Sequence, residues 1–182
     1  MPSLSPQERH SLLQSALDAR SLSYSPYSKF RVGAAVLLTD GSIVQGANVE
    51  NASYGAGVCA ERTAILTASA TRFTRSPTQP ASASHSPSSY PLTGAIRAIA
   101  VSSDLPNDPC SPCGICRQFI REFAPLDTPI LMVWAKWQGG SAGEVKEESK
   151  RGQGCYDEEG VIVRTLEELL PLSFGPDELN KM

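Results

Sequence analysis

The chain has 182 residues, an apolar fraction of 41%, a charged fraction of 19% and a formal net charge of −3 at pH 7. These values predict one globular domain with a sizeable core. The acidic balance argues against a nucleic-acid partner, which requires a basic face. The first residues lack the apolar stretch of a secretory signal, and no run is long enough to cross a membrane, so we expect an intracellular, cytoplasmic protein.

Helices and strands are predicted to alternate from the start of the chain. Ser5-Pro6-Gln7-Glu8 is a capping box with proline at the first helical position, and apolar residues then recur at helical spacing. Two apolar runs flank Asp40-Gly41, which is typical of a hairpin, so strands are expected near 30–38 and 42–49. A second helix is expected from about residue 59 to residue 70.

The second half continues the alternation as strand, helix, strand, strand and helix, expected at 95–103, 114–124, 129–135, 161–165 and 165–171. Two polar stretches, near 71–93 and 136–157, interrupt the pattern and are expected to be surface insertions in a single domain spanning 1–182. Alternating elements with an opening hairpin predict an α/β fold: a three-layer α/β/α sandwich with a mixed sheet of about five strands.

The five cysteines are an odd number in a protein expected to keep its thiols reduced, so a disulfide framework is unlikely to explain them. Cys59 stands at the expected start of one helix, in "NVENASYGAGVCAERTAI". Cys113 and Cys116 open another, in "DPCSPCGICRQFIREF". Thiolates at two helix N-termini could hold a zinc ion with an empty fourth position, which is typical of a catalytic site. Glu61 could then face that position and move protons.

Other interpretations of the thiols remain open. A single thiol at a helix start is more often part of a core. Cys110 would close the site into a structural zinc centre. The run of three cysteines also resembles iron–sulfur ligation, although Ile120 stands where the next cysteine of that pattern would be. Three thiolates with Zn²⁺ carry a charge of −3 + 2 = −1, which Arg62 and Arg117 could offset unless they lie on solvated helix faces.

The spacing of Cys59-Ala60-Glu61 and of Pro112-Cys113-Gly114-Ile115-Cys116 is similar to the zinc-deaminase signature, with cysteine as the first ligand. Four blocks, "YSPYSKFRVGAAVL", "NVENASYGAGVCAERTAI", "SPCGICRQFIREF" and "ELLPLSFGP", resemble the cytidine deaminase family in its small homotetrameric form, in the family order. They span most of the chain from Tyr24 to Pro176, and the two polar insertions depart from the pattern.

The resemblance implies a role for each of ten residues. Cys59, Cys113 and Cys116 would be the zinc ligands, and Glu61 the proton shuttle. The substrate would be contacted by Asn48 and Glu50 at the ribose hydroxyls, Phe30 at the pyrimidine ring, the Ala60 amide at the base O2, Tyr54 near the sugar, and Phe174 from a neighbouring subunit. From the residues alone, Asn48 and Glu50 could equally be a solvated strand end, and Phe30 and Phe174 core residues.

The implied reaction is zinc-dependent hydrolysis of cytidine and 2′-deoxycytidine to the uridine forms and ammonia, a step of pyrimidine salvage. A polynucleotide deaminase, a deaminase of another aminopyrimidine nucleoside, a structural zinc module and an iron–sulfur protein are the alternatives. The acidic charge argues against the first, and the presence of Asn48 and Glu50 argues against the second.

Overall fold

The computed structural model describes residues 3–72, 92, 94–139 and 160–176. Most of the two polar stretches predicted as insertions lies outside these residues. Within them, the elements follow the predicted order.

A mixed five-stranded sheet forms the centre of the molecule, in the order β2-β1-β3-β4-β5. Only β3 and β4 run parallel, and the other neighbouring pairs are antiparallel. The strands span Val32–Leu38 (β1), Ile43–Ala47 (β2), Ile96–Ser103 (β3), Pro129–Val133 (β4) and Val161–Thr165 (β5). The predicted mixed sheet is therefore confirmed.

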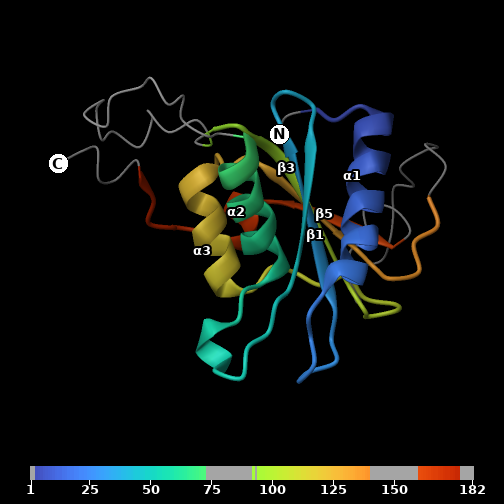
Figure 1. Ribbon diagram of the computed structural model, residues 1–182. Coiled ribbons are helices and arrows are strands. Elements are labelled where there is room, and N and C mark those ends of the chain that lie inside the picture. Colours follow the sequence, from blue (N-terminus) through green and yellow to red (C-terminus); the bar gives the residue numbers. More distant parts are fainter. Residues whose placement is uncertain (1–2, 73–91, 93, 140–159, 177–182) are drawn as a thin grey trace.

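Helices cover both faces of this sheet, so the predicted three-layer sandwich is confirmed (Figure 1). Helix α1 (Pro6–Ala19) lies on one face, and α2 (Ala60–Arg72) and α3 (Gly114–Phe123) lie side by side on the other. A last short helix, α4, spans Leu166–Leu169. The capping box at the start of α1 is present, with the Ser5 hydroxyl accepting from the Glu8 N–H.

Each helical layer has its own apolar core against the sheet. On the α1 face, Leu12, Leu13 and Ala16 pack with β-strand residues such as Leu37 and Leu131. On the other face, residues of α2 and α3 pack with the opposite side of the same strands, since successive side chains of a strand point to opposite faces. The core against α2 and α3 sets the distance between the two helix N-termini that carry the thiols.

The glycine at position 46 lets α2 approach β2 closely. A Cβ atom added there would meet the backbone of Ala64 and lie 2.6 Å from the carbonyl oxygen of Ala60. The first turn of α2 therefore rests directly on the strand backbone.

The first two strands are shorter than predicted. The predicted strand at 30–38 begins at Val32, and the one at 42–49 ends at Ala47. At this end of the hairpin, the Asn48 side chain replaces ladder bonds: its Nδ2 donates to the Phe30 carbonyl (3.0 Å), and its Oδ1 accepts from the Val32 N–H (2.8 Å). Phe30 thus precedes the sheet.

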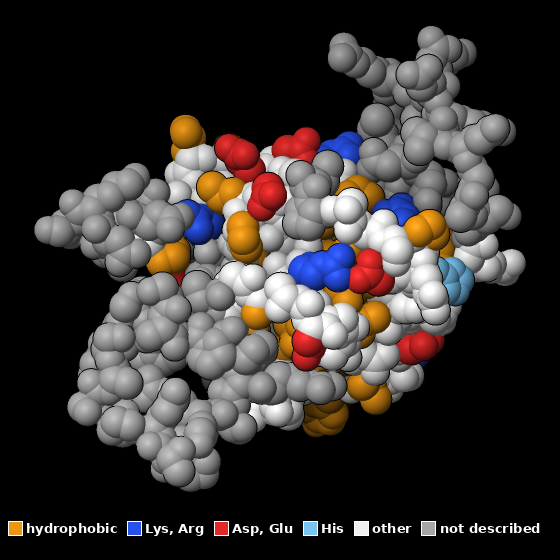
Figure 2. Space-filling view, turned by 90° about the horizontal axis from the view of Figure 1, so that it is seen from above, with side chains coloured by type: hydrophobic (Ala, Val, Ile, Leu, Met, Phe, Trp, Pro, Cys, Tyr) orange, Lys and Arg blue, Asp and Glu red, His pale blue; other side chains and the backbone are white. Residues whose placement is uncertain are grey.

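Two further observations concern membrane spans and the charge on one face. Among the residues that the structure describes, none of the helices has the length and apolarity needed to cross a bilayer. On the face shown in Figure 2, basic and acidic side chains are interspersed.

Candidate active site

Three thiols converge where the N-termini of α2 and α3 meet. Cys59 directly precedes α2, Cys113 is the N-cap of α3, and Cys116 lies in its first turn. Their sulfur atoms all lie within 4.8 Å of one another, and the Sγ atoms of Cys59 and Cys113 are 3.8 Å apart. Residues separated by more than fifty positions therefore form one cluster.

The geometry of this thiol cluster fits a tetrahedral metal ion. Zinc–sulfur bonds of about 2.3 Å at tetrahedral angles place two sulfur ligands about 3.8 Å apart. Soft thiolate ligands favour zinc, copper(I) or iron–sulfur centres over hard cations. Three thiolates leave one tetrahedral position open to another ligand, as in catalytic rather than structural sites.

The fourth nearby thiol, Cys110, is not part of this cluster. It is half-buried and lies next to Ser103 at the end of β3, where burial chiefly raises the pKa of its thiol. Its position does not support a closed centre of four thiols.

The carboxyl group of Glu61 is buried beside the thiols. Glu61 is only 3% exposed, in the first turn of α2. Burial raises the pKa of this carboxyl group above its ordinary value, and the negative charge on Cys59 acts in the same direction. A carboxyl group held here can take up and give back a proton close to the metal position.

The pKa values of two thiols of the cluster, Cys59 and Cys116, shift in opposite directions. A hydrogen bond with Cys116 lowers the pKa of the Cys59 thiol to about 5, and Arg62 and Cys113 add to the effect. The same hydrogen bond, together with burial, raises the pKa of Cys116. The Arg62 Nη2 lies 3.8 Å from the Cys59 Sγ and 3.2 Å from the Gly57 carbonyl oxygen. Arg62 is therefore placed to offset thiolate charge.

Arg117 does not take part in this way, although the sequence offered it as a second neutralising cation. Its guanidinium group donates to the Pro112 carbonyl, to the Ser111 hydroxyl and to the Leu169 carbonyl. These acceptors are neutral, and two of them precede Cys113 in the chain.

A short backbone pairing joins the predicted sugar-binding residues to the thiol cluster. Val49 and Val58 exchange two N–H···O bonds of 2.9 Å. Val49 lies between Asn48 and Glu50, and Val58 directly precedes Cys59. The two polar residues are thereby held next to the start of α2.

The Asn48 side chain is largely committed to protein contacts. Besides its bonds to the backbone of Phe30 and Val32, its Oδ1 accepts from the Ser23 hydroxyl at 2.6 Å. An amide has two N–H groups, so these contacts within the described residues leave one for a ligand. The interpretation of Asn48 as part of a solvated strand end is therefore wrong.

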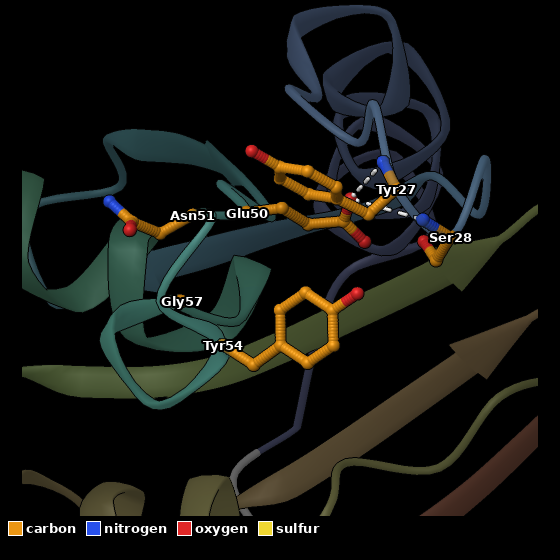
Figure 3. Close-up of a pocket in the computed structure, with 6 residues that line it drawn as sticks. All are labelled: Tyr27, Ser28, Glu50, Asn51, Tyr54 and Gly57. Atoms are coloured by element: carbon orange, nitrogen blue, oxygen red, sulfur yellow. Dashed lines mark hydrogen bonds between the residues drawn. The ribbon is translucent and has the colours of Figure 1, made fainter.

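Glu50 lines an open pocket of ≈ 380 Å³ together with Tyr27, Ser28, Asn51, Tyr54 and Gly57. Its carboxylate accepts from the Tyr27 and Ser28 N–H groups at 2.8 and 3.2 Å, shown as dashed lines in Figure 3. Contacts with Ser28 lower the pKa of Glu50 most strongly. The rings of Tyr27 and Tyr54 meet edge to face, 5.9 Å apart, whereas Asn51 points away from them.

The remaining predicted residues occupy three different places. Phe30 is half-buried beside Asn48. Ala60 is fully buried and opens α2, where first-turn N–H groups lack helical acceptors. Phe174 is 60% exposed on the C-terminal segment, where its carbonyl accepts from Gln118 of α3. It is not among the described residues that line the pocket at Glu50.

Sequence reasoning gave no role to Tyr27 and Ser28. Both belong to the block "YSPYSKF", whose turn brings two backbone N–H groups to Glu50. Backbone donors leave no trace in residue type, so only the density of polar and aromatic residues in that block pointed to them.

Three thiols on two helix N-termini, with a buried carboxyl group next to them on an α/β/α sandwich, define a class of protein. Such a set is typical of the zinc deaminases. Comparison with known proteins leads to the same class and narrows it.

The model of the family described as "Cytidine and deoxycytidylate deaminase zinc-binding region" matches residues 6–132. A cytidine deaminase of Halalkalibacterium halodurans is 35% identical over 95% of this chain and 98% of its own length. The crystal structure of a cytidine deaminase from Burkholderia pseudomallei superposes with a TM-score of 0.65 at 32% identity, covering 91% of this chain and 98% of that one. A cytidine deaminase structure from Mycobacterium tuberculosis gives 0.57 at 28% identity, covering 91% and 95%. The chain belongs to the cytidine deaminase family and is a hydrolytic enzyme.

Proposed function

We propose that this protein is a zinc-dependent enzyme that hydrolyses cytidine and 2′-deoxycytidine to uridine and 2′-deoxyuridine, with release of ammonia, in pyrimidine salvage. The observation that carries the proposal is the meeting of three thiols with the buried carboxyl group of Glu61. Names of the relatives support cytidine as substrate. The fit of the sulfur positions to a tetrahedral ion supports zinc.

Cys59, Cys113 and Cys116 would hold the zinc ion, with Arg62 offsetting part of their charge. Zinc bound by such a set supplies Lewis acidity that lowers the pKa of water toward neutrality. Cys110 takes no part in ligation.

Glu61 would move the protons of the reaction. It takes one from the attacking water while the oxygen bonds to C4 of the pyrimidine, and it delivers one to ring N3. It then takes the proton of the C4 hydroxyl group and passes it to the amino group, so that the C4–N4 bond breaks as the C4=O bond forms, and ammonia leaves. One carboxyl group can serve these steps because its protonation alternates through the cycle, and its burial keeps bulk water from competing for the proton.

Substrate would be held by residues on both sides of the Val49–Val58 pairing. The free N–H of Asn48 and the carboxylate of Glu50 suit the ribose hydroxyls, because one donates and the other accepts. Phe30 would lie against the pyrimidine ring, and the Ala60 N–H would reach the base O2. Tyr54 would lie near the sugar, at the pocket that Glu50 lines.

We further propose that the enzyme is a homotetramer in which Phe174 completes a neighbouring subunit's site. Phe174 is 60% exposed and Tyr54 is 80% exposed, so two aromatic rings are left uncovered in one chain. An adjacent copy would cover such rings. The whole of 1–182 would be one deaminase domain, with 71–93 and 136–157 as surface insertions. A reducing cytoplasm suits a site made of three free thiolates.

The proposal is tested by following cytidine absorbance in the ultraviolet with wild-type protein, with protein stripped by a chelator, and with stripped protein given zinc again. We expect loss of absorbance matched by ammonia release, its abolition on stripping, and its return with about one zinc ion per chain. Folded, zinc-loaded protein that leaves both cytidine and 2′-deoxycytidine unchanged would refute it.

A further inference from the structure

The three thiols of the cluster are not held equally firmly by the fold. Cys116 is fully buried within α3. Cys59 directly follows Val58, whose backbone is paired with Val49. Cys113 is exposed, is the N-cap of α3, and has no hydrogen bond from its side chain to the helix backbone. It ends an irregular connection of ten residues, 104–113, between β3 and α3. Cys113 is thus the ligand whose position depends most on its surroundings.

The part of this connection next to β3 is held by the sheet. The Asp104 N–H donates to the Arg31 carbonyl, and the Ala135 N–H donates to the Leu105 carbonyl, both at 3.1 Å. The part next to Cys113 is reached by Arg117 instead. Its Nε donates to the Pro112 carbonyl and its Nη2 to the Ser111 hydroxyl, each at 2.7 Å.

The third nitrogen of the same guanidinium group contacts another segment. Nη1 of Arg117 donates at 2.8 Å to the carbonyl of Leu169, the last residue of α4. Carbonyls at a helix C-terminus lack helical donors, so this bond satisfies one of them. Helix α4 is itself tied to the sheet, because the Leu166 N–H donates to the Thr128 carbonyl at 3.0 Å. Arg117 therefore links the end of the connection that precedes Cys113 to helix α4 by hydrogen bonds.

We propose that Arg117 is a positioning residue for the metal centre, which holds Cys113 in place through these three hydrogen bonds. The inference rests on the proposed zinc site but concerns a residue whose guanidinium group donates to two carbonyls and a hydroxyl group rather than to a thiol. A rigid fork of donors is required, because three acceptors on two segments must be reached at once. A lysine ammonium would keep the charge without reaching them all.

The test measures how fast zinc leaves the holoenzyme in an excess of a chromogenic chelator. Loss of outer contacts to metal ligands typically weakens binding about 10–100-fold. We expect Arg117→Ala to release zinc faster by about that factor, and Arg117→Lys to behave almost as badly. Ser111→Ala, which removes one exposed acceptor and should fold normally, is expected to release zinc only a few-fold faster, because it loses one of the three hydrogen bonds.

Gln118→Ala is the matched control, because the hydrogen bond that Gln118 donates to the Phe174 carbonyl joins α3 to the C-terminal segment rather than to the connection before Cys113. It should release zinc at the wild-type rate. Unfolding midpoints of the metal-free variants show whether faster release reflects general loosening, in which case the midpoint would fall as the release rate rises.

The outcomes separate the two proposals. Wild-type release from Arg117→Ala, or full rescue by Arg117→Lys, overturns the positioning role, the latter in favour of a charge effect. Wild-type protein that binds no zinc, or a Cys113→Ala variant that still binds it, overturns the metal site itself.

Discussion

Glu61 is the residue whose environment is hardest to explain by stability alone. A carboxyl group that is 3% exposed loses most of its hydration, and the Cys59 thiol next to it has a lowered pKa. Such burial is costly unless the group is paired or kept neutral. Its location beside three thiols gives it a chemical use that an apolar side chain could not supply.

The ion pair between Glu8 and Arg97 gives a residue-scale prediction about pH. Hydrogen bonding by Arg97, whose Nη1 lies 2.6 Å from Oε1, is the largest influence that lowers the pKa of Glu8 from 4.5 to about 2. A lowered folded-state pKa stabilises the fold above the unfolded pKa and loses that contribution as pH falls through the folded one. The advantage of wild type over Glu8→Gln should therefore be present at pH 6 and fade between about pH 4.5 and pH 2.

Urea unfolding of the two proteins across this pH range provides the measurement. In an Arg97→Gln background the difference should shrink, because the main donor is gone. A difference between wild type and Glu8→Gln that is independent of pH would contradict the assignment.

At the scale of elements, the site depends on how closely α2 lies against β2. Gly46→Ala would place a methyl group against the backbone of Ala60 and Ala64, which no side-chain rotation can relieve. Overpacking of this kind typically costs about 1–3 kcal/mol. We expect a loss of that size in the free energy of unfolding, measured with urea.

Gly55→Ala is the control for this substitution. Within the part of the chain that the structure describes, no atom beyond the two neighbouring residues lies within 4 Å of the added Cβ, and Gly55 is not among the glycines with positive φ. Its unfolding free energy should stay close to that of wild type. Equal stability of the two variants would show that α2 does not need the close approach.

Element types and order could be predicted from this sequence, because periodicity, the Ser5 capping box and the Asp40-Gly41 turn are local signals. Strand ends could not, since the Asn48 side chain takes over the ladder bonds at 30–32. Ile115 shows the same limit. In the sequence it stands at helical spacing from Phe119, Ile120 and Phe123, which predicts that it shares their apolar side of α3, yet it is 67% exposed.

The metal-binding residues could be proposed from spacing, since two helix starts rich in cysteine suggest one centre. Their partners could not. From the sequence, Arg62 and Arg117 are both predicted to offset thiolate charge. In the structure Arg62 lies against Cys59, whereas Arg117 donates to the carbonyl of Pro112 in the connection before Cys113. Which distant residues a long side chain such as that of Arg117 reaches depends on tertiary packing, and one sequence does not reveal that packing.

At the scale of the whole molecule, the two helical layers of the sandwich differ in whether they carry residues of the candidate active site. The α1 face contains an apolar core and lies away from the thiols. The α2–α3 face brings the three clustered thiols, Glu61 and the C-terminal segment with Phe174 to one side of the sheet. Neighbouring copies docking on this side would complete the sites that one chain leaves open.

Turnover of cytidine by Glu61→Gln tests the central claim most directly. Glutamine keeps the size of the side chain but can neither accept the proton of water nor deliver one to N3. A single acid–base step is typically worth about 10²–10⁴-fold, so kcat should fall by at least the upper part of that range. Zinc content and assembly mass should equal those of wild type, because the carboxyl group is not a ligand. A variant that keeps most of its turnover, or that loses its zinc, would contradict the account.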